Sequence, residues 1–81
     1  MTTGDPEPLL MKLLCLEGEK LPRDLCKEAK HFIDHGECGL AYDVIVYHVR
    51  IGNAALSARG LQYLVDAGTI MGVKYPDYCF N

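Results

Sequence analysis

The spacing of apolar and polar residues along the chain predicts helices. Apolar side chains recur at intervals of three and four in four stretches, which is the period of an amphipathic helix. Alternation with a period of two, which would indicate a strand, does not extend over a useful length. Each stretch is followed by a glycine, a residue favoured in left-handed C-terminal caps; these are Gly18, Gly36, Gly52 and Gly68. We therefore expect four helices.

Residues suited to a helix N-terminus support the predicted starts. Asp5 offers a side-chain cap and is followed by a proline, whose missing N–H is harmless in the first turn. Pro22 opens the second helix in the same way, and Ser57 is a suitable N-cap for the fourth. The first helix should end near Glu17 and the third should begin near Glu37. The fourth should end near Gly68 or Gly72.

The same periodicity predicts which faces are buried. Five leucines between residues 9 and 16 cover more than one stripe of the first helix, so this helix should form the centre of the core. The predicted core residues of the other helices are Leu25, Cys26, Ala29, Phe32, Ile33, Leu40, Ala41, Val44, Ile45, His48, Val49, Leu61, Leu64 and Val65. His48 is expected to be a hydrogen-bonded core histidine. Tyr42 and Val46 fall at the margin of the third stripe, where their side chains would be available to a partner.

Short connections between helices favour antiparallel neighbours, so the predicted fold is all-α, a compact four-helix bundle. The last eight residues, 74–81, carry three aromatic side chains around Pro76 without helical period, which predicts an irregular aromatic C-terminal tail. Eighty-one residues have room for one domain, so residues 1–81 are expected to form a single core.

Composition indicates a soluble globular protein, with 49% hydrophobic and 23% charged residues. The formal charge of −3 and the lack of clustered Lys and Arg argue against direct binding of nucleic acid, and they suit a basic protein partner. The first residues lack a basic segment, and Lys12 interrupts the only early apolar stretch. We therefore expect no signal peptide, no membrane span and a cytoplasmic location.

The cysteines and histidines give little support for metal binding or catalysis. The four cysteines form no closely spaced pair, so free thiols are expected. A zinc cluster could be drawn from Cys26, His31, His35 and Cys38, but structural zinc sites normally show two close ligand pairs. A nucleophilic site written from Cys38 and His35 with Asp34 rests only on adjacency in sequence. We expect no metal, no other cofactor and no enzymatic activity.

One group of residues around the second and third helices suits a protein-binding surface. Asp34, Glu37 and Asp43 would form an acidic patch at this corner and on the outer side of the third helix, with Tyr42 and Tyr47 beside them. Carboxylates suit a partner's Arg or Lys, and tyrosine is a frequent hot-spot residue. These five residues are the predicted partner-binding site.

The run from His35 to Asp43, followed by an apolar helix, then Leu56–Ser57 and Met71–Gly72–Val73, resembles the MafI-type immunity proteins. These are small helical proteins of bacterial polymorphic-toxin and contact-dependent inhibition systems. The resemblance covers roughly residues 20 to 74, and the chain departs from the pattern in its tyrosine-rich tail and in the Gly52–Ala55 connection. The matching positions are Glu37, Gly39, Leu40, Ala41, Asp43, Leu56, Ser57, Met71 and Gly72.

The resemblance implies a protein that binds a cognate toxin domain and blocks its active site or its substrate-binding face. If the toxin is a nuclease, Glu37, Asp43 and Asp34 would stand in for phosphate groups, and Tyr42 and Tyr47 would be anchors. The composition also permits a helical adaptor or regulatory subunit unrelated to a toxin. A third alternative is a small metal-dependent or redox protein built on the cysteines.

Overall fold

Four α-helices make up most of the computed structural model, which describes residues 5–72. They are α1 (Pro6–Glu17), α2 (Arg23–Asp34), α3 (Cys38–Arg50) and α4 (Ala58–Met71), and a short 3-10 turn, η1 (Gly18–Lys20), follows α1. Within residues 5–72 there is no strand, so the predicted all-α four-helix fold is confirmed. The predicted aromatic tail lies outside the described residues.

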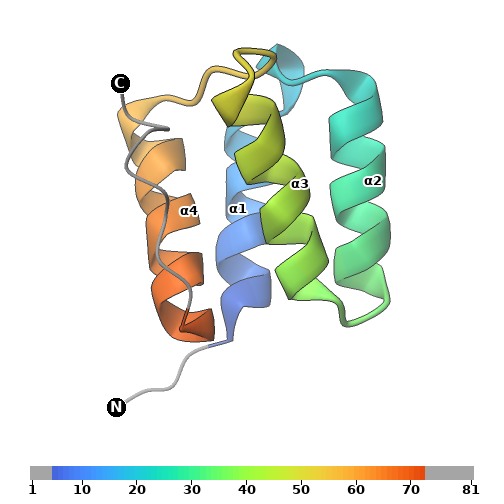
Figure 1. Ribbon diagram of the computed structural model, residues 1–81, viewed down its shortest axis with the longest axis vertical. Coiled ribbons are helices and arrows are strands. Elements are labelled where there is room, and N and C mark those ends of the chain that lie inside the picture. The colour runs from blue at the N-terminus through green and yellow to red at the C-terminus, as the bar shows by residue number, and fades with distance from the viewer. Residues whose placement is uncertain (1–4, 73–81) are drawn as a thin grey trace.

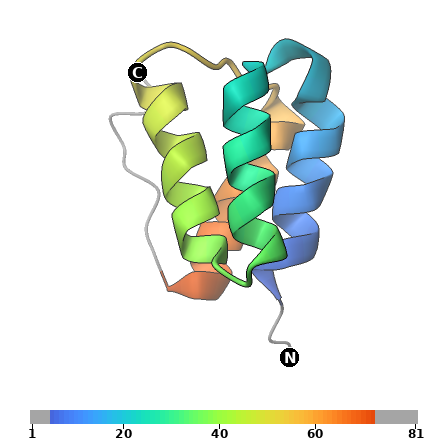
Figure 2. The same ribbon diagram turned by 90° about the vertical axis from the view of Figure 1, so that its right-hand side faces the viewer.

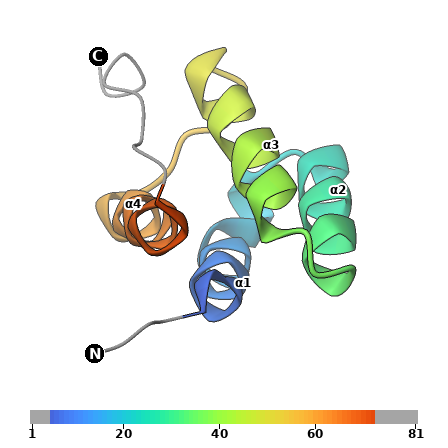
Figure 3. The same ribbon diagram turned by 60° about the horizontal axis from the view of Figure 1, so that its bottom comes forward.

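Helix α1 lies at the centre and packs against each of the other three helices (Figures 1 and 3). The antiparallel pair α2 and α3 lies on one side of it, and α4 lies on the other. In the view of Figure 2, α2 faces the viewer, with α3 on its left and α1 on its right. None of the helices in residues 5–72 is both long and apolar enough to cross a membrane.

The core is a single cluster in which Leu10 and Leu13 of α1 are fully buried. Leu25, Ile45 and Leu64, one from each of the other helices, are also fully buried and surround them. The prediction that α1 is the central element is therefore confirmed. The buried face of α1 is narrower than expected, however, because Leu16 remains 45% exposed.

The helix ends follow the predicted caps with two exceptions. The Asp5 side chain accepts a hydrogen bond of 3.0 Å from the Glu7 backbone N–H, and the Ser57 hydroxyl accepts one of 3.2 Å from Gly60. Glycines in the left-handed region, with φ of 73° at Gly36 and 77° at Gly72, end α2 and α4. The predicted left-handed caps at Gly18 and Gly68 are wrong, because Gly18 has right-handed helical angles (φ −50°, ψ −42°) and Gly68 lies inside α4. The alternative predicted end of α4, at Gly72, is confirmed.

Gly68 is buried because the aromatic ring of Tyr42 packs on it. A Cβ at this position would lie 2.7 Å from the Tyr42 hydroxyl oxygen, so only glycine lets α4 approach α3 this closely. Tyr42 and Val46, predicted to be available to a partner, are instead buried, at 2% and 9% exposure. Leu40, predicted to be core, is 44% exposed. The buried face of α3 is thus rotated toward α4 relative to the predicted stripe.

A buried carboxylate joins the end of α1 to the start of α4. Glu17 is fully buried, and its Oε2 accepts hydrogen bonds from the Ser57 backbone N–H at 2.7 Å and from the Ser57 hydroxyl at 2.5 Å. Its Oε1 forms an ion pair of 3.1 Å with Lys20 Nζ. Burial raises the pKa of Glu17, but the Ser57 hydrogen bonds and the Lys20 charge together lower it by more. The carboxylate is therefore held ionised at the positive end of the α4 dipole.

Candidate functional site

An open groove of about 440 Å³ runs between α2 and α3, and we call it the α2–α3 groove. Its two walls are adjacent antiparallel helices joined by the turn at Gly36 (Figure 1). The lining residues are Glu28 and Phe32 of α2 and Leu40, Asp43, Val44, Tyr47 and His48 of α3.

The α3 wall of the groove is unusually apolar for a solvent-exposed surface. Five large hydrophobic residues are strongly exposed among residues 5–72, and three of them, Leu40, Tyr47 and Ile51, lie at or just after α3. Spacings of seven and four residues place these three on one face; Leu40 and Tyr47 line the groove, and Ile51 lies just beyond the lining residues. Tyr47 and Ile51 are each 52% exposed. Contiguous exposed apolar side chains of this kind mark interaction surfaces.

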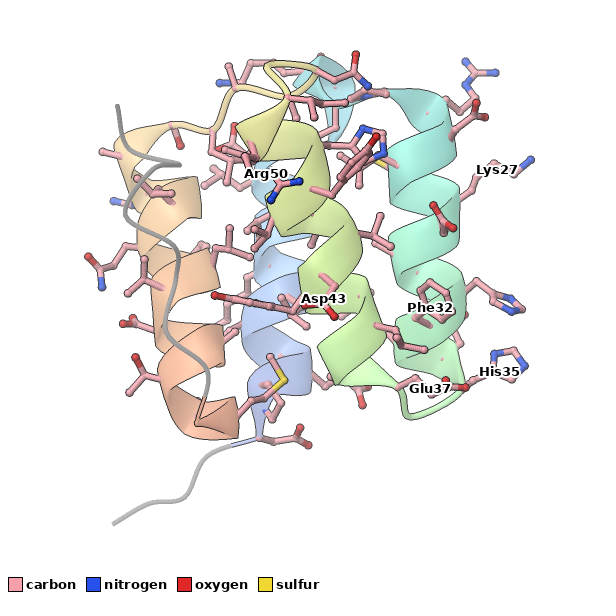
Figure 4. All side chains as sticks on the ribbon, viewed as in Figure 1. Lys27, Phe32, His35, Glu37, Asp43 and Arg50 are labelled. Atoms are coloured by element: carbon pink, nitrogen blue, oxygen red, sulfur yellow. The ribbon has the colours of Figure 1, made fainter. Side chains whose placement is uncertain are left out.

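We call Leu40, Tyr47 and Ile51 the apolar strip, and carboxylates lie on both sides of the groove beside it. Successive residues of a helix are rotated by about 100°. This rotation places Glu28 farther from α3 than Phe32 is, and Asp43 farther from α2 than Tyr47 is. Both acids are exposed, and the lining residues include no Lys or Arg. Figure 4 shows Phe32 on α2 and Asp43 on α3, with Glu37 at the turn that joins the two helices. The lining is therefore mainly apolar along its middle, where His48 is the one polar side chain, and acidic at its margins. The exposed Arg50 is not a lining residue, but it lies seven residues after Asp43 and so on the same side of α3.

His48 and Tyr47 are held in place at the end of the groove away from the turn. Asn53 Nδ2 lies 2.8 Å from His48 Nδ1 and donates to it, and the rings of Tyr47 and His48 meet edge to face at 5.6 Å. The predicted hydrogen bond of His48 is thus present. Its predicted place in the core is wrong, because the half-buried ring lines the groove.

The structure separates the five predicted site residues. Asp43 and Tyr47 line the groove, and the exposed Glu37 lies at the turn where it begins. Tyr42 is buried against α4, so its predicted role as a partner anchor is wrong. Asp34 lies about 200° around α2 from Phe32, on the opposite flank, and forms an ion pair of 3.3 Å with Lys30. Asp34 therefore does not belong to the groove.

Five lining residues were absent from the predicted site. Four of them were placed in the core, because helical periodicity marks a position as apolar but does not show which side of the helix its neighbours leave uncovered; these are Phe32, Leu40, Val44 and His48. Glu28 was given no role in the sequence analysis, because an acid on a helix is most often solvated. Its position one turn before Phe32 was the available signal that the two share a side of α2.

A second groove lies on the other flank of α2, against α1. It has a volume of about 350 Å³ and is lined by Met11, Leu14, Cys15, Gly18, Cys26 and Lys30. It contains no aromatic ring and no carboxylate, and its one charged residue, Lys30, is paired with Asp34. The α2–α3 groove, with its aromatic and acidic side chains, is the stronger candidate for a binding surface.

The cysteines and histidines of the described residues are not arranged as a metal site. Within residues 5–72, no three His, Cys, Asp or Glu side chains are grouped so as to hold a metal ion. Cys15, Cys26 and Cys38 are free thiols. Burial raises the pKa of Cys26, and burial together with the nearby Glu7 and Asp5 carboxylates raises that of Cys38. The last two thiols are therefore poorly activated.

The fold and the groove together define a small all-α domain with an acidic, partly apolar surface groove. No protein-family model matches the chain, no curated protein is significantly similar to it, and no solved structure matches it significantly.

Proposed function

We propose that this chain is an immunity-type protein that binds and neutralises a cognate bacterial toxin domain through the α2–α3 groove. The observation that carries the proposal is the exposed apolar strip of Leu40, Tyr47 and Ile51 beside Phe32, bordered by acids. Such side chains lose their unfavourable contact with water when a partner covers them. The segment that resembles the MafI-type proteins, His35–Asp43, forms the turn and the first part of the α3 wall.

The charges on the groove suit a basic partner surface. Glu28, Asp43 and Glu37 would steer a positively charged toxin face during approach and complement it at contact. Phe32 and Tyr47 would be the anchors, because aromatic side chains at the centre of an interface supply most of its binding energy. A nuclease toxin has such a basic face where it holds phosphates, and the carboxylates would occupy that face in place of its substrate.

Co-expression with the toxin encoded beside this protein tests the proposal. We expect the chain to restore growth and to co-purify with the toxin. Asp43→Lys should weaken both effects, because it puts a like charge against the basic face. Asp34→Lys is the matched control, since Asp34 is also exposed but lies on the opposite flank of α2. Absence of rescue by the unmodified chain, with the toxin shown to be active, would refute the proposal.

The apolar strip has its own matched control. Leu40 on the groove and Leu16 on α1 are 44% and 45% exposed, so replacing either with alanine should change stability little and similarly. Only Leu40→Ala should lower the affinity for the toxin. If both variants bind as the unmodified chain does, the toxin contacts another surface. Capture of a partner that is not a toxin, through the same groove, would favour the helical adaptor.

A further inference from the structure

We infer that the α2–α3 groove receives an amphipathic helix of the partner, whose apolar stripe is flanked on both sides by Lys or Arg. The inference rests on the proposed function, because it takes the groove as the surface that contacts the partner. It adds the kind of structural element that the partner presents and the charge pattern of that element. Three features of the groove lead to it: the order of residues across it, its length and the helical nature of its walls.

The order of side chains across the groove is acid, apolar, acid. On α2, Glu28 is the lining residue farthest from α3, and Phe32 lies nearer to it. On α3, His48 and then Val44 lie nearest to α2, and Asp43 lies farthest from it. A helix that lies in this groove would place its apolar stripe on Phe32 and Val44. The residues on either side of that stripe would then lie beside the carboxylates, where Lys or Arg is favoured and Glu or Asp is repelled.

The length of the exposed strip matches a short helix. From Leu40 to Ile51 the strip extends along α3 for about 16 Å, which equals roughly three turns of a partner helix. Side chains at i, i+3 or i+4, i+7 and i+11 of such a helix lie on one face and together span about 16 Å, the length of the strip.

The helical walls of the groove exclude the main alternative, in which the partner binds as an extended peptide that adds a strand to a sheet. An extended peptide gains its affinity by hydrogen bonding to the open edge of a sheet. Both walls here are α-helices, whose interior backbone N–H and C=O groups bond within the helix and offer no such edge. Packing of a third helix against a helix pair needs only side-chain contacts, through ridges and grooves.

Designed peptides test the inference on the full chain. The first probe is an 18-residue helical peptide with leucine at i, i+3, i+4 and i+7 and lysine on both flanks. The second carries glutamate in place of each lysine, and the third is a scrambled form of the first. Binding would be followed by NMR titration of the ¹⁵N-labelled protein, which reports both the affinity and the amides that are affected.

We expect the lysine-flanked peptide to shift amides of Glu28, Phe32, Leu40 and Tyr47 and to bind about tenfold or more tightly than the glutamate-flanked one at low salt. The preference should shrink as salt is added, because the flanking charges are exposed. The double variant Glu28→Lys with Asp43→Lys should reverse the preference between the two peptides. Asp34→Lys should leave it unchanged.

Several results would overturn the inference. They are equal affinity for the scrambled peptide, shifts confined to residues outside the groove, self-association of the chain through the groove, and binding that begins only after removal of residues 73–81. The last two would place a second copy or the chain's own C-terminal segment in the groove. Toxin rescue without peptide binding would overturn the helical partner and leave the proposed function standing. Peptide binding without toxin rescue would overturn the proposed function and leave the helical partner standing.

Discussion

Replacing Gly60 with alanine should destabilise this protein, although alanine is the better helix former. Gly60 lies in the first turn of α4, and a Cβ there would overlap the Oε2 atom of the buried Glu17 carboxylate. The same oxygen accepts both hydrogen bonds from Ser57. A Cβ at position 60 must therefore displace the carboxylate from its partners or move α4 away from α1.

The energies of the gained and lost interactions decide whether Gly60→Ala raises or lowers stability. Gly→Ala in a helix gains at most about 1 kcal/mol. Hydrogen bonds to a charged group contribute about 1.5–3 kcal/mol each, and both bonds from Ser57 are affected. Even partial loss of the two exceeds the gain, so we expect Gly60→Ala to lower the free energy of unfolding by about 1–3 kcal/mol.

The effect should change sign when the carboxylate is absent. Glu17→Ala alone should cost about 2–4 kcal/mol, through the lost hydrogen bonds and the space that it leaves. In that background the Cβ at position 60 meets no carboxylate, so Gly60→Ala should be neutral or stabilising by up to about 1 kcal/mol.

Urea unfolding of the four proteins of this cycle, followed by far-UV circular dichroism, measures the coupling. Gly39→Ala in α3 is the matched control, because a Cβ at Gly39 would meet no atom within 4 Å. It should raise stability by a similar small amount with and without Glu17. If Gly60→Ala stabilised the unmodified chain as Gly39→Ala does, the packing of Glu17 on α4 would be refuted.

Three further predictions concern ionisation and packing. The pKa of Glu17 is lower in the folded than in the unfolded chain, so the unfolded chain takes up the proton first as the pH falls. The stability advantage of the unmodified protein over Glu17→Gln should therefore be complete above about pH 4.5 and shrink below it. Urea titrations in which the two free energies of unfolding differ by the same amount at every pH would contradict this. Gly68→Ala should cost about 1–3 kcal/mol in thermal unfolding, because it collides with Tyr42. Alkylation of Cys26 and Cys38 at neutral pH should be slower in the folded than in the urea-unfolded chain, and equal rates would argue against their burial.

The helices and most of their ends could be predicted because the responsible interactions are local. Ser57 caps a backbone N–H three residues away, and Gly36 and Gly72 end helices through their own φ angles. The face of α3 could not be predicted in the same way. Leu40, Tyr42 and Val46 give this helix apolar side chains around much of its circumference. Which of them is buried depends on where α4 lies, and that position depends on the absence of a side chain at Gly68.

Glu17 illustrates the same limit for a charged residue. At the end of a predicted helix, an acid is expected to be solvated, and nothing near it in the sequence suggests otherwise. Its hydrogen-bonding partner, Ser57, is 40 residues away. The burial of Glu17 follows from the way α4 returns alongside α1, with the start of α4 beside the end of α1 (Figure 2).

The candidate groove, in contrast, could have been found from the sequence by folding the predicted hairpin about its turn. In an antiparallel helix pair, residues equally distant from the turn lie opposite each other. Phe32 and Leu40 lie four residues before and after Gly36. Glu28 and Val44 lie eight residues before and after it. All four line the groove. The sequence-based site grouped acids by nearness along the chain and so included Asp34, which points to the other flank. Pairing residues across the turn, one helical turn at a time, selects the side chains that actually share a surface.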